Sequence, residues 1–245
     1  MSGHSKWATI KHKKGAADAK RGQMFTKLIK EISIAARMGG GDPESNARLR
    51  TAILKARGAN MPKDNIERAI KKGTGELGAS TYEELVYEAY LPGGIAMLIE
   101  VLTDNKNRAA AEVRNIITKA GGSLATSNAV LRLFERKGVI SIDGEKYEED
   151  KIMELALEGG ADDIVNEEGE IIVYTTPDAF EAVMNAINNA EIETDGAEIS
   201  MVPESYVKAD KDTGAKIHKL IDKLEENDDV QNVYHNGELP DEEEA

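Results

Sequence analysis

Cysteine is missing from this chain, and its absence excludes disulfide bonds, thiol catalysis and cysteine-ligated metal sites. Long apolar runs are missing too: no stretch reaches the roughly 18 residues that a membrane-spanning helix needs. The first residues carry charges but no apolar segment, which argues against a secretory signal. Aromatic residues make up only 4%, so the cores must be built from Ile, Leu, Val, Ala and Met. We therefore expect a soluble, cytoplasmic protein.

Catalytic and cofactor signatures are also absent. The sequence has no nucleophilic-serine motif, no zinc-protease motif and no phosphate-binding loop. Residues 73–78 match G-x-G-x-x-G, but they follow a predicted helix and precede a predicted strand, the reverse of the order in a dinucleotide site. His4 and His12 have no carboxylate or thiol beside them, so they do not indicate a metal site. We expect no enzyme, no cofactor, no metal and no small-molecule substrate.

What the chain does have is a strong division of charge. Residues 1–75 hold 17 Lys and Arg against 6 Asp and Glu, a formal charge of +11. Residues 76–245 hold 14 against 39, a formal charge of −25. A basic segment joined to an acidic remainder suits a polyanionic partner, above all nucleic acid. The alternative is a solvated basic tail that only keeps the protein soluble.

The basic part is predicted to contain three short helices, because apolar residues recur in it at three- and four-residue spacings. The first runs from about Asp18 to the glycines at 39–41. The second opens with Asp42 as N-cap and Pro43 in its first turn. The third spans residues 62–73. No helix stands out as a recognition helix, so a helix-turn-helix is not indicated.

Residues 1–16 show no apolar period and are predicted to form an arm that becomes ordered only when it packs or binds. Trp7, the one tryptophan, either stacks on an unpaired base or anchors the arm to the helices. Each single lysine could still be a solvated surface charge. The predicted nucleic-acid-binding residues of the arm and first helix are Lys6, Trp7, Lys11, Lys13, Lys14, Lys20, Arg21, Lys27 and Lys30.

The acidic part begins with a predicted hairpin, formed by residues 83–90 and 95–103 around a Pro-Gly-Gly turn. A helix over residues 106–120 and a strand over 129–135 follow. Near the end of the chain, a helix and a strand over 211–235 have no partners close in sequence. They complete the hairpin's domain if the region between is an insertion.

That intervening region has the predicted order β-α-β-β-α-β, the ferredoxin-like plan. Its first strand is predicted at 139–142, and its second helix at 177–189, capped by Thr176. Its strands lack the aromatic pattern of an RNA-recognition sheet, so we expect the acidic domains to contact protein or to set the reach of the arm. The predicted fold is thus α+β: a small N-terminal helical domain, then two ferredoxin-like-type α/β domains, one inserted in the other. The predicted domains are 1–77, 78–137 with 204–238, the inserted 138–203, and an acidic tail at 239–245.

Beyond these patterns, the sequence resembles the YebC/PmpR family of bacterial proteins, which has mitochondrial translational-activator relatives. The resemblance covers essentially the whole chain, and its most specific part is the string Gly3-His4-Ser5-Lys6-Trp7. It implies a helical domain with two mixed α/β domains, and a cytoplasmic, non-enzymatic regulator of gene expression. Other matching positions are Ile10-Lys11, Lys13-Lys14, Phe25-Thr26-Lys27-Leu28, Asp42-Pro43, Tyr87-Glu88, Pro92-Gly93-Gly94 and Asp104-Asn105-Lys106-Asn107-Arg108.

The resemblance implies two alternative functions. One is a sequence-specific DNA-binding transcriptional regulator, and the other is a ribosome-associated factor that eases stalling at proline-rich stretches. A basic arm with one tryptophan, beside small helices, suits folded RNA better than a DNA major groove. We therefore place the ribosome or rRNA first and DNA second. A protein-interaction adaptor that acts through the acidic domains is a third hypothesis, and no membrane partner is expected.

Overall fold

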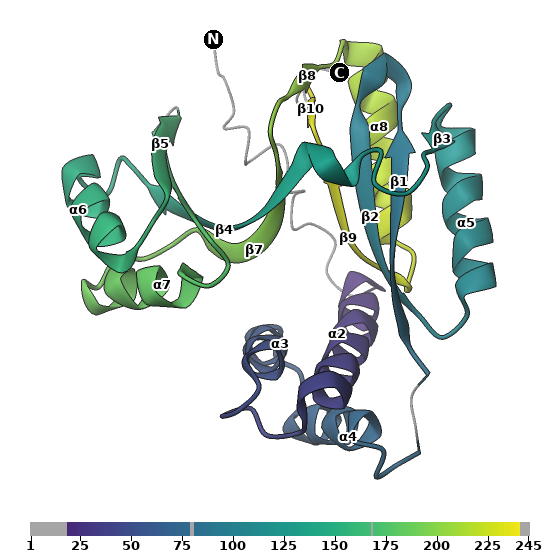
Figure 1. The fold of residues 1–245 in the computed structure, drawn as a ribbon, viewed down its shortest axis with the longest axis horizontal. Coiled ribbons are helices and arrows are strands. Elements are labelled where there is room, and N and C mark those ends of the chain that lie inside the picture. Colours follow the sequence, from purple (N-terminus) through teal and green to yellow (C-terminus); the bar gives the residue numbers. More distant parts are fainter. Residues whose placement is uncertain (1–18, 79–80, 168, 241–245) are drawn as a thin grey trace. The chain divides into compact units, whose positions relative to one another are not determined.

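The computed structural model describes residues 19–78, 81–167 and 169–240 (Figure 1). These residues gather in two compact units. The discontinuous unit holds the described residues within 13–130, 209–235 and 239–245, and the inserted unit holds those within 131–208 and 236–238. The four predicted domain boundaries stay predictions, and each unit is described by itself below.

Three helices form the N-terminal, helical part of the discontinuous unit: α2 (Ala19–Gly39), α3 (Ala47–Gly58) and α4 (Lys63–Gly73). Their apolar stripes meet in one core, as the spacing predicted. At Gly73 an added Cβ would lie 2.2 Å from the Ser33 carbonyl oxygen, so this glycine is required for α4 to approach α2. The buried residues include Ile32, Ala36, Leu49, Ile53, Ala56, Met61, Ile66 and Ala69.

The predicted start of the second helix at Asp42 is wrong, because α3 begins at Ala47 with Asn46 as its N-cap. The Asn46 Oδ1 accepts a hydrogen bond from the Leu49 N–H at 3.1 Å. Its Nδ2 donates to two carbonyl oxygens at the end of α2, both at 2.8 Å. An asparagine side chain donates and accepts at once, whereas an ionised aspartate only accepts. Asn46 therefore joins the end of one helix to the start of the next.

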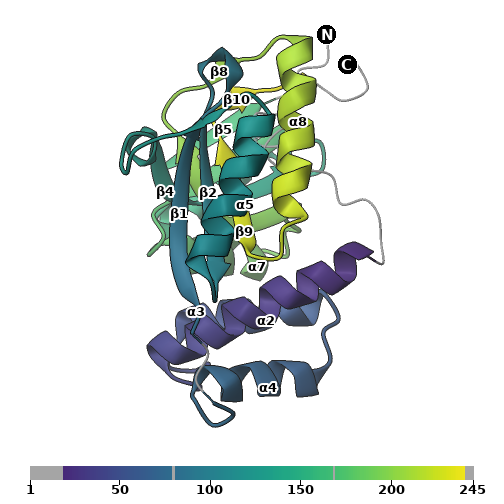
Figure 2. The same ribbon diagram turned by 90° about the vertical axis from the view of Figure 1, so that its right-hand side faces the viewer.

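The rest of the discontinuous unit is an antiparallel sheet of order β3-β1-β2-β9. Helices α5 and α8 lie side by side over one face of it (Figure 2). A short 3-10 helix, η1 (Pro92–Gly94), makes the turn of the predicted hairpin. The elements are β1 (Glu83–Tyr90), β2 (Ala96–Thr103), α5 (Lys106–Lys119), β3 (Ser123–Leu124), α8 (Lys211–Glu225) and β9 (Val230–His235).

Strand β9 returns from the end of the chain and pairs with β2, placing Tyr234 opposite Leu98. Leu98 is 1% exposed, so the pairing lies within the buried part of the sheet. The C-terminal helix and strand thus complete the sheet that the hairpin begins, as the sequence predicted.

The inserted unit is a second antiparallel sheet, of order β5-β6-β4-β7, with α6 and α7 on one face (Figure 1). Its core includes Ile140, Ile152 and Val183, all 0% exposed. This is the predicted β-α-β-β-α-β plan, which confirms the α+β fold class. Its elements are β4 (Phe134–Asp143), α6 (Glu149–Gly159), β5 (Asp163–Glu167), β6 (Glu170–Thr175), α7 (Phe180–Asn189) and β7 (Gly196–Pro203), with a short parallel pair β8 (Val207–Lys208) and β10 (Gly237–Glu238).

The sequence predicted two strands, at 129–135 and 139–142, where the structure has the single strand β4, preceded by a 3-10 turn, η2 (Leu131–Leu133). The buried Glu88 carboxylate on β1 accepts the N–H groups of Asn128 at 2.6 Å and Val130 at 2.7 Å. These bonds hold the chain in a turn, so it cannot pair as a strand there.

Helix α7 begins at Phe180 and not at Pro177, although the Thr176 hydroxyl accepts the Ala179 N–H at 3.2 Å as a cap would. Within the described ranges, none of the helices combines the length and apolarity that a bilayer crossing demands.

Candidate nucleic-acid interface

The predicted nucleic-acid-binding residues fall into three groups. Five of them lie outside the described residues: Lys6, Trp7, Lys11, Lys13 and Lys14. Lys20 and Arg21 belong to the first turn of α2, where only the backbone is described. Lys27 and Lys30 are described in full, and both have partners within the discontinuous unit.

Lys30 lies at a buried contact between α2 and the α8–β9 connection. Its residue is 8% exposed, and its Nζ donates to the Asp229 Oδ1 at 2.6 Å and the Asp228 carbonyl oxygen at 2.8 Å. A buried ammonium needs such partners, because removing its hydration without compensation is costly. In this conformation Lys30 therefore fixes α2 to the sheet, and its role as a phosphate contact stays a prediction.

Asp229 is the centre of this contact. Its Oδ2 accepts hydrogen bonds from the Thr103 hydroxyl at 2.9 Å and from an Arg108 N–H at 2.8 Å. Its Oδ1 accepts the hydrogen bond from Lys30. Burial by itself would raise the pKa of Asp229, but the hydrogen bonds from these three side chains outweigh burial and lower it. The carboxylate is thus held ionised and joins α2, β2 and α5.

Two more α2 side chains bind the C-terminal end of α8. The Lys27 Nζ donates to the Glu225 carbonyl oxygen at 2.7 Å, and the Gln23 Nε2 donates to that of Glu226 at 2.9 Å. The last carbonyls of a helix have no partner within it and carry partial negative charge, so a lysine there is doubly favourable. Burial lowers the pKa of Lys27, and the nearby carboxylates of Glu225 and Asp228 oppose that shift only in part.

Arg48 is a further internal cation, and it links α3 to α2 and β1. Its Nε donates to the Glu31 Oε1 at 2.8 Å, and its other guanidinium nitrogens donate to Glu84. Burial would lower the pKa of Arg48, but the hydrogen bonds to Glu84 and Glu31 outweigh burial and raise it. Arg48 therefore serves the packing of the helical part.

Four exposed cationic side chains on α3 and α4 have no hydrogen-bond or ion-pair partner among the described residues. We call them the α3–α4 cation set: Lys55, Arg57, Arg68 and Lys71. A fifth, Lys63, pairs with Glu67 at 3.5 Å, but its side chain is 85% exposed, so this pair contributes little to stability. These side chains are positive charge of the helical part that is available to a polyanion.

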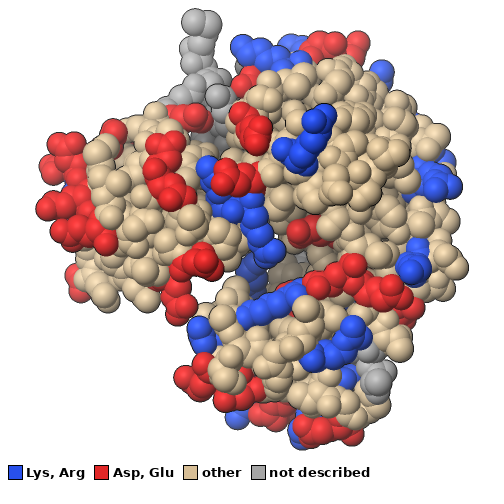
Figure 3. Space-filling view, viewed as in Figure 1, with Lys and Arg blue, Asp and Glu red and all other residues tan. Residues whose placement is uncertain are grey.

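Helix α6 of the inserted unit has the opposite surface charge. Exposed acidic side chains follow its length, including Glu149, Asp150, Glu154 and Glu158, and acidic atoms gather over it in Figure 3. Such a surface repels a polyanion and suits a basic partner.

Sequence reasoning missed both Asp229 and the α3–α4 cation set. Asp229 had no signal, because nothing in the neighbouring sequence marks a contact with a lysine 199 residues away. The unpartnered cations had a signal, since Lys55 and Arg57 fall outside the predicted apolar stripe of α3.

The described residues also bear on metal binding and on His218. Among the described residues, no group of three or more His, Asp or Glu side chains is arranged to hold a metal ion. His218 is 8% exposed, and one of its ring nitrogens lies 3.0 Å from the Pro240 carbonyl oxygen, which accounts for it as a packed core residue.

Comparison with known proteins gives a consistent result over nearly the whole chain. A family model described as "TACO1/YebC protein N-terminal domain" matches residues 5–76, and one described as "TACO1/YebC second and third domain" matches residues 82–237. A protein of Treponema denticola is 66% identical over 240 residues, which cover 98% of this chain and 97% of that protein. One of Treponema pallidum is 63% identical over 242 residues, which cover 99% of each. Both are named "Probable transcriptional regulatory protein".

A solved structure agrees with the fold. The crystal structure of a conserved hypothetical protein from Aquifex aeolicus superimposes with a TM-score of 0.84 at 48% sequence identity. The match covers 97% of this chain and 98% of that one.

Proposed function

The chain belongs to the TACO1/YebC family, and from that premise we propose that it is a cytoplasmic, non-enzymatic regulator of gene expression that binds nucleic acid. The observation that carries the proposal is the division of charge, +11 over residues 1–75 against −25 over the remainder. The names of the relatives, which call them probable transcriptional regulators, support a regulatory role.

We propose RNA, on the ribosome, as the first target. The α3–α4 cation set is spread over two helices and is not aligned along one helix that could enter a major groove. Distributed phosphate contacts with one stackable tryptophan suit folded RNA. In this proposal the protein eases stalling at proline-rich stretches, as the resemblance implies.

Two other functions have support of their own. The relatives' names favour a sequence-specific DNA-binding transcriptional regulator. The acidic surface of α6 favours an adaptor that binds a basic protein, with or without nucleic acid.

Ribosome co-sedimentation from DNase-treated lysate distinguishes these functions. The test variant replaces Lys6, Lys11, Lys13 and Lys14 with Glu and spares Lys27, because replacing Lys27 would also break its contact with α8. The matched control makes the same charge change in the acidic part, at the exposed Lys151, Lys208, Lys216 and Lys219.

If the ribosome is the target, wild type and control pellet with ribosomes at low salt, and the arm variant stays in the supernatant. Release of the wild type by moderate salt is expected too, because phosphate contacts weaken steeply with ionic strength. Wild type that stays in the supernatant but shifts particular DNA duplexes supports the DNA function. If the wild type and the arm variant pellet equally, the arm has no role in ribosome binding.

A further inference from the structure

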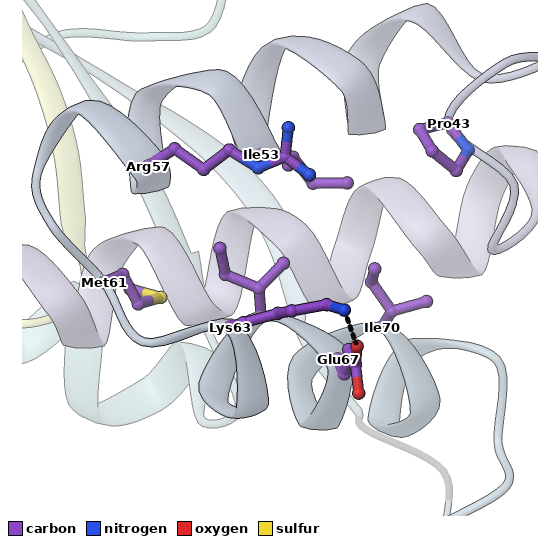
Figure 4. A pocket seen from close by; sticks show the side chains of 8 residues that line it. Pro43, Ile53, Arg57, Met61, Lys63, Glu67 and Ile70 are labelled. Carbon is purple, nitrogen blue, oxygen red and sulfur yellow. Dashed lines mark ion pairs between the residues drawn. The ribbon is translucent and has the colours of Figure 1, made fainter.

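A pocket of about 280 Å³ lies between α3 and α4 (Figure 4). Its apolar lining comes from Ile53, Met61, Ile66 and Ile70, with Pro43 at one end. Ile53, Met61 and Ile66 are 5–6% exposed and belong to the helical core, so the floor of the pocket is part of the packed interior. Ligand pockets for drug-sized molecules measure about 300–1,000 Å³, so this one, just below that range, has room for one small group.

Charged side chains stand around this apolar floor. Arg57 projects from α3, and Lys63 extends along α4 toward Glu67 (Figure 4). The Arg57 guanidinium has no hydrogen-bond or ion-pair partner within the described ranges. Lys63 shares its charge with Glu67, and both side chains are more than half exposed. Other members of the α3–α4 cation set on the same two helices add to the positive field.

We infer that this pocket takes one unstacked nucleobase of a single-stranded RNA segment, while Arg57 and Lys63 bind the phosphates beside it. The inference rests on the proposed function and deepens it, because it names where a base is held. The apolar floor matches the face of a base, and a guanidinium at the rim can stack on that face or bind phosphate.

Charge complementarity favours a nucleotide over other occupants. A nucleotide joins a flat, largely apolar ring to an anion, and the pocket joins an apolar floor to two cations, Arg57 without a described partner and Lys63 in a weak, exposed pair with Glu67. An acidic peptide with one apolar anchor has similar chemistry, but its charges are not fixed next to the anchor. The positive charge of the whole N-terminal part suits a ligand with an anion at every repeat.

The test compares two strands of equal length and charge: a short single-stranded RNA, and an abasic strand with the same phosphates but no bases. Wild-type protein is expected to bind the RNA at least about fivefold more tightly than the abasic strand. Ile70→Phe fills the pocket without changing charge, and it is expected to bring this ratio close to one while affinity for the abasic strand is unchanged. Leu54→Phe, which makes a similar change at an exposed side chain of α3 outside the pocket, is the matched control and is expected to keep the wild-type ratio.

A second measurement needs no substitution that could disturb folding. Adenosine monophosphate added to wild-type protein with labelled isoleucine methyl groups is expected to shift the signals of Ile53 and Ile70 and to leave those of Ile140 and Ile152 in place. Shifts of the two pocket methyls support the inference, and their absence at saturating nucleotide overturns it.

These experiments distinguish failure of the proposed function from failure of the pocket inference. If neither strand binds, the proposed function fails and the pocket inference falls with it. If both strands bind wild type equally, nucleic-acid binding stands and the pocket inference alone is overturned. A pocket that responds to an acidic, leucine-bearing peptide but not to the nucleotide also overturns it, in favour of a protein partner.

Discussion

The two sides of the helical part use positive charge differently. On the α2 side, Lys27 and Lys30 donate to the backbone and carboxylate of the α8–β9 connection. On the α3–α4 side, the side chains of Lys55, Arg57, Arg68 and Lys71 have no partner among the described residues and are exposed. The same residue types thus build the fold on one side and leave a charged surface on the other. Counting cations in the sequence overstates what is available to a ligand.

The physical difference is the cost of desolvation. A buried ammonium such as that of Lys30 must be paired, and removing its partner leaves an uncompensated charge. An exposed cation remains hydrated and can exchange water for phosphate at little cost. We therefore expect changes at the partnered cations Lys27, Lys30 and Arg48 to alter stability, and changes in the α3–α4 cation set to alter binding.

The largest effect on stability is expected from Asp229→Ala. This change leaves Lys30 buried without its carboxylate and removes a partner of Arg108 and Thr103. We expect the free energy of unfolding to fall by about 3–5 kcal/mol. Urea denaturation of the full chain measures it. Asp228→Ala is the control, because that side chain is exposed and only its backbone oxygen receives Lys30, so a loss below about 0.5 kcal/mol is expected.

The contact of Asp229 with Lys30 also predicts a smaller loss of unfolding free energy, which occurs at acid pH. Because the pKa of Asp229 is lower in the folded chain than in the unfolded one, its contribution is fully present above the unfolded pKa. That contribution is lost as pH falls below about 4 toward the folded pKa. Urea midpoints measured between neutral and acid pH should therefore decline less steeply for Asp229→Ala than for wild type. Parallel declines would contradict the ionised, hydrogen-bonded state of Asp229.

Arg48→Gln is expected to cost about 1 kcal/mol of unfolding free energy, a value reduced by the partial exposure of the guanidinium. It loses the hydrogen bonds that join α3 to Glu31 and Glu84. Thermal and urea denaturation would show the loss. Arg68→Gln makes the same chemical change on the α3–α4 side and serves as the control.

The smallest effect on stability is expected on the α3–α4 side. Replacing any one member of the α3–α4 cation set with Gln should change the free energy of unfolding by less than about 0.5 kcal/mol. A loss as large as that of Arg48→Gln would show that the side chain has a structural role, and the two sides would no longer differ.

Local patterns predicted most of the fold. The hairpin and the β-α-β-β-α-β order followed from apolar period and turn residues, which depend on neighbours in sequence. The errors arose where a distant group decided the outcome: Asn46 caps α3 while it also binds the end of α2, and Glu88 on β1 holds the turn at residues 128–130.

The site was harder to predict for the same reason. The excess of positive charge in residues 1–75 can be counted directly from the sequence. Which of those cations have partners depends on contacts such as Lys30 with Asp229, which join residues 199 positions apart. No local pattern contains that information. The arm residues of the predicted site stay predictions, since they lie outside the described residues.

The most direct test of the account is the salt dependence of RNA binding by two variants of the full chain. One replaces Lys55, Arg57, Arg68 and Lys71 with Gln, and the other replaces the exposed Lys151, Lys208, Lys216 and Lys219 with Gln. The slope of log affinity against log salt for single-stranded RNA should fall by about 0.7 for each phosphate that the first variant no longer binds, and should not change in the second. Equal slopes for the two variants and wild type would contradict the claim that the α3–α4 side of the helical part is a nucleic-acid-binding surface.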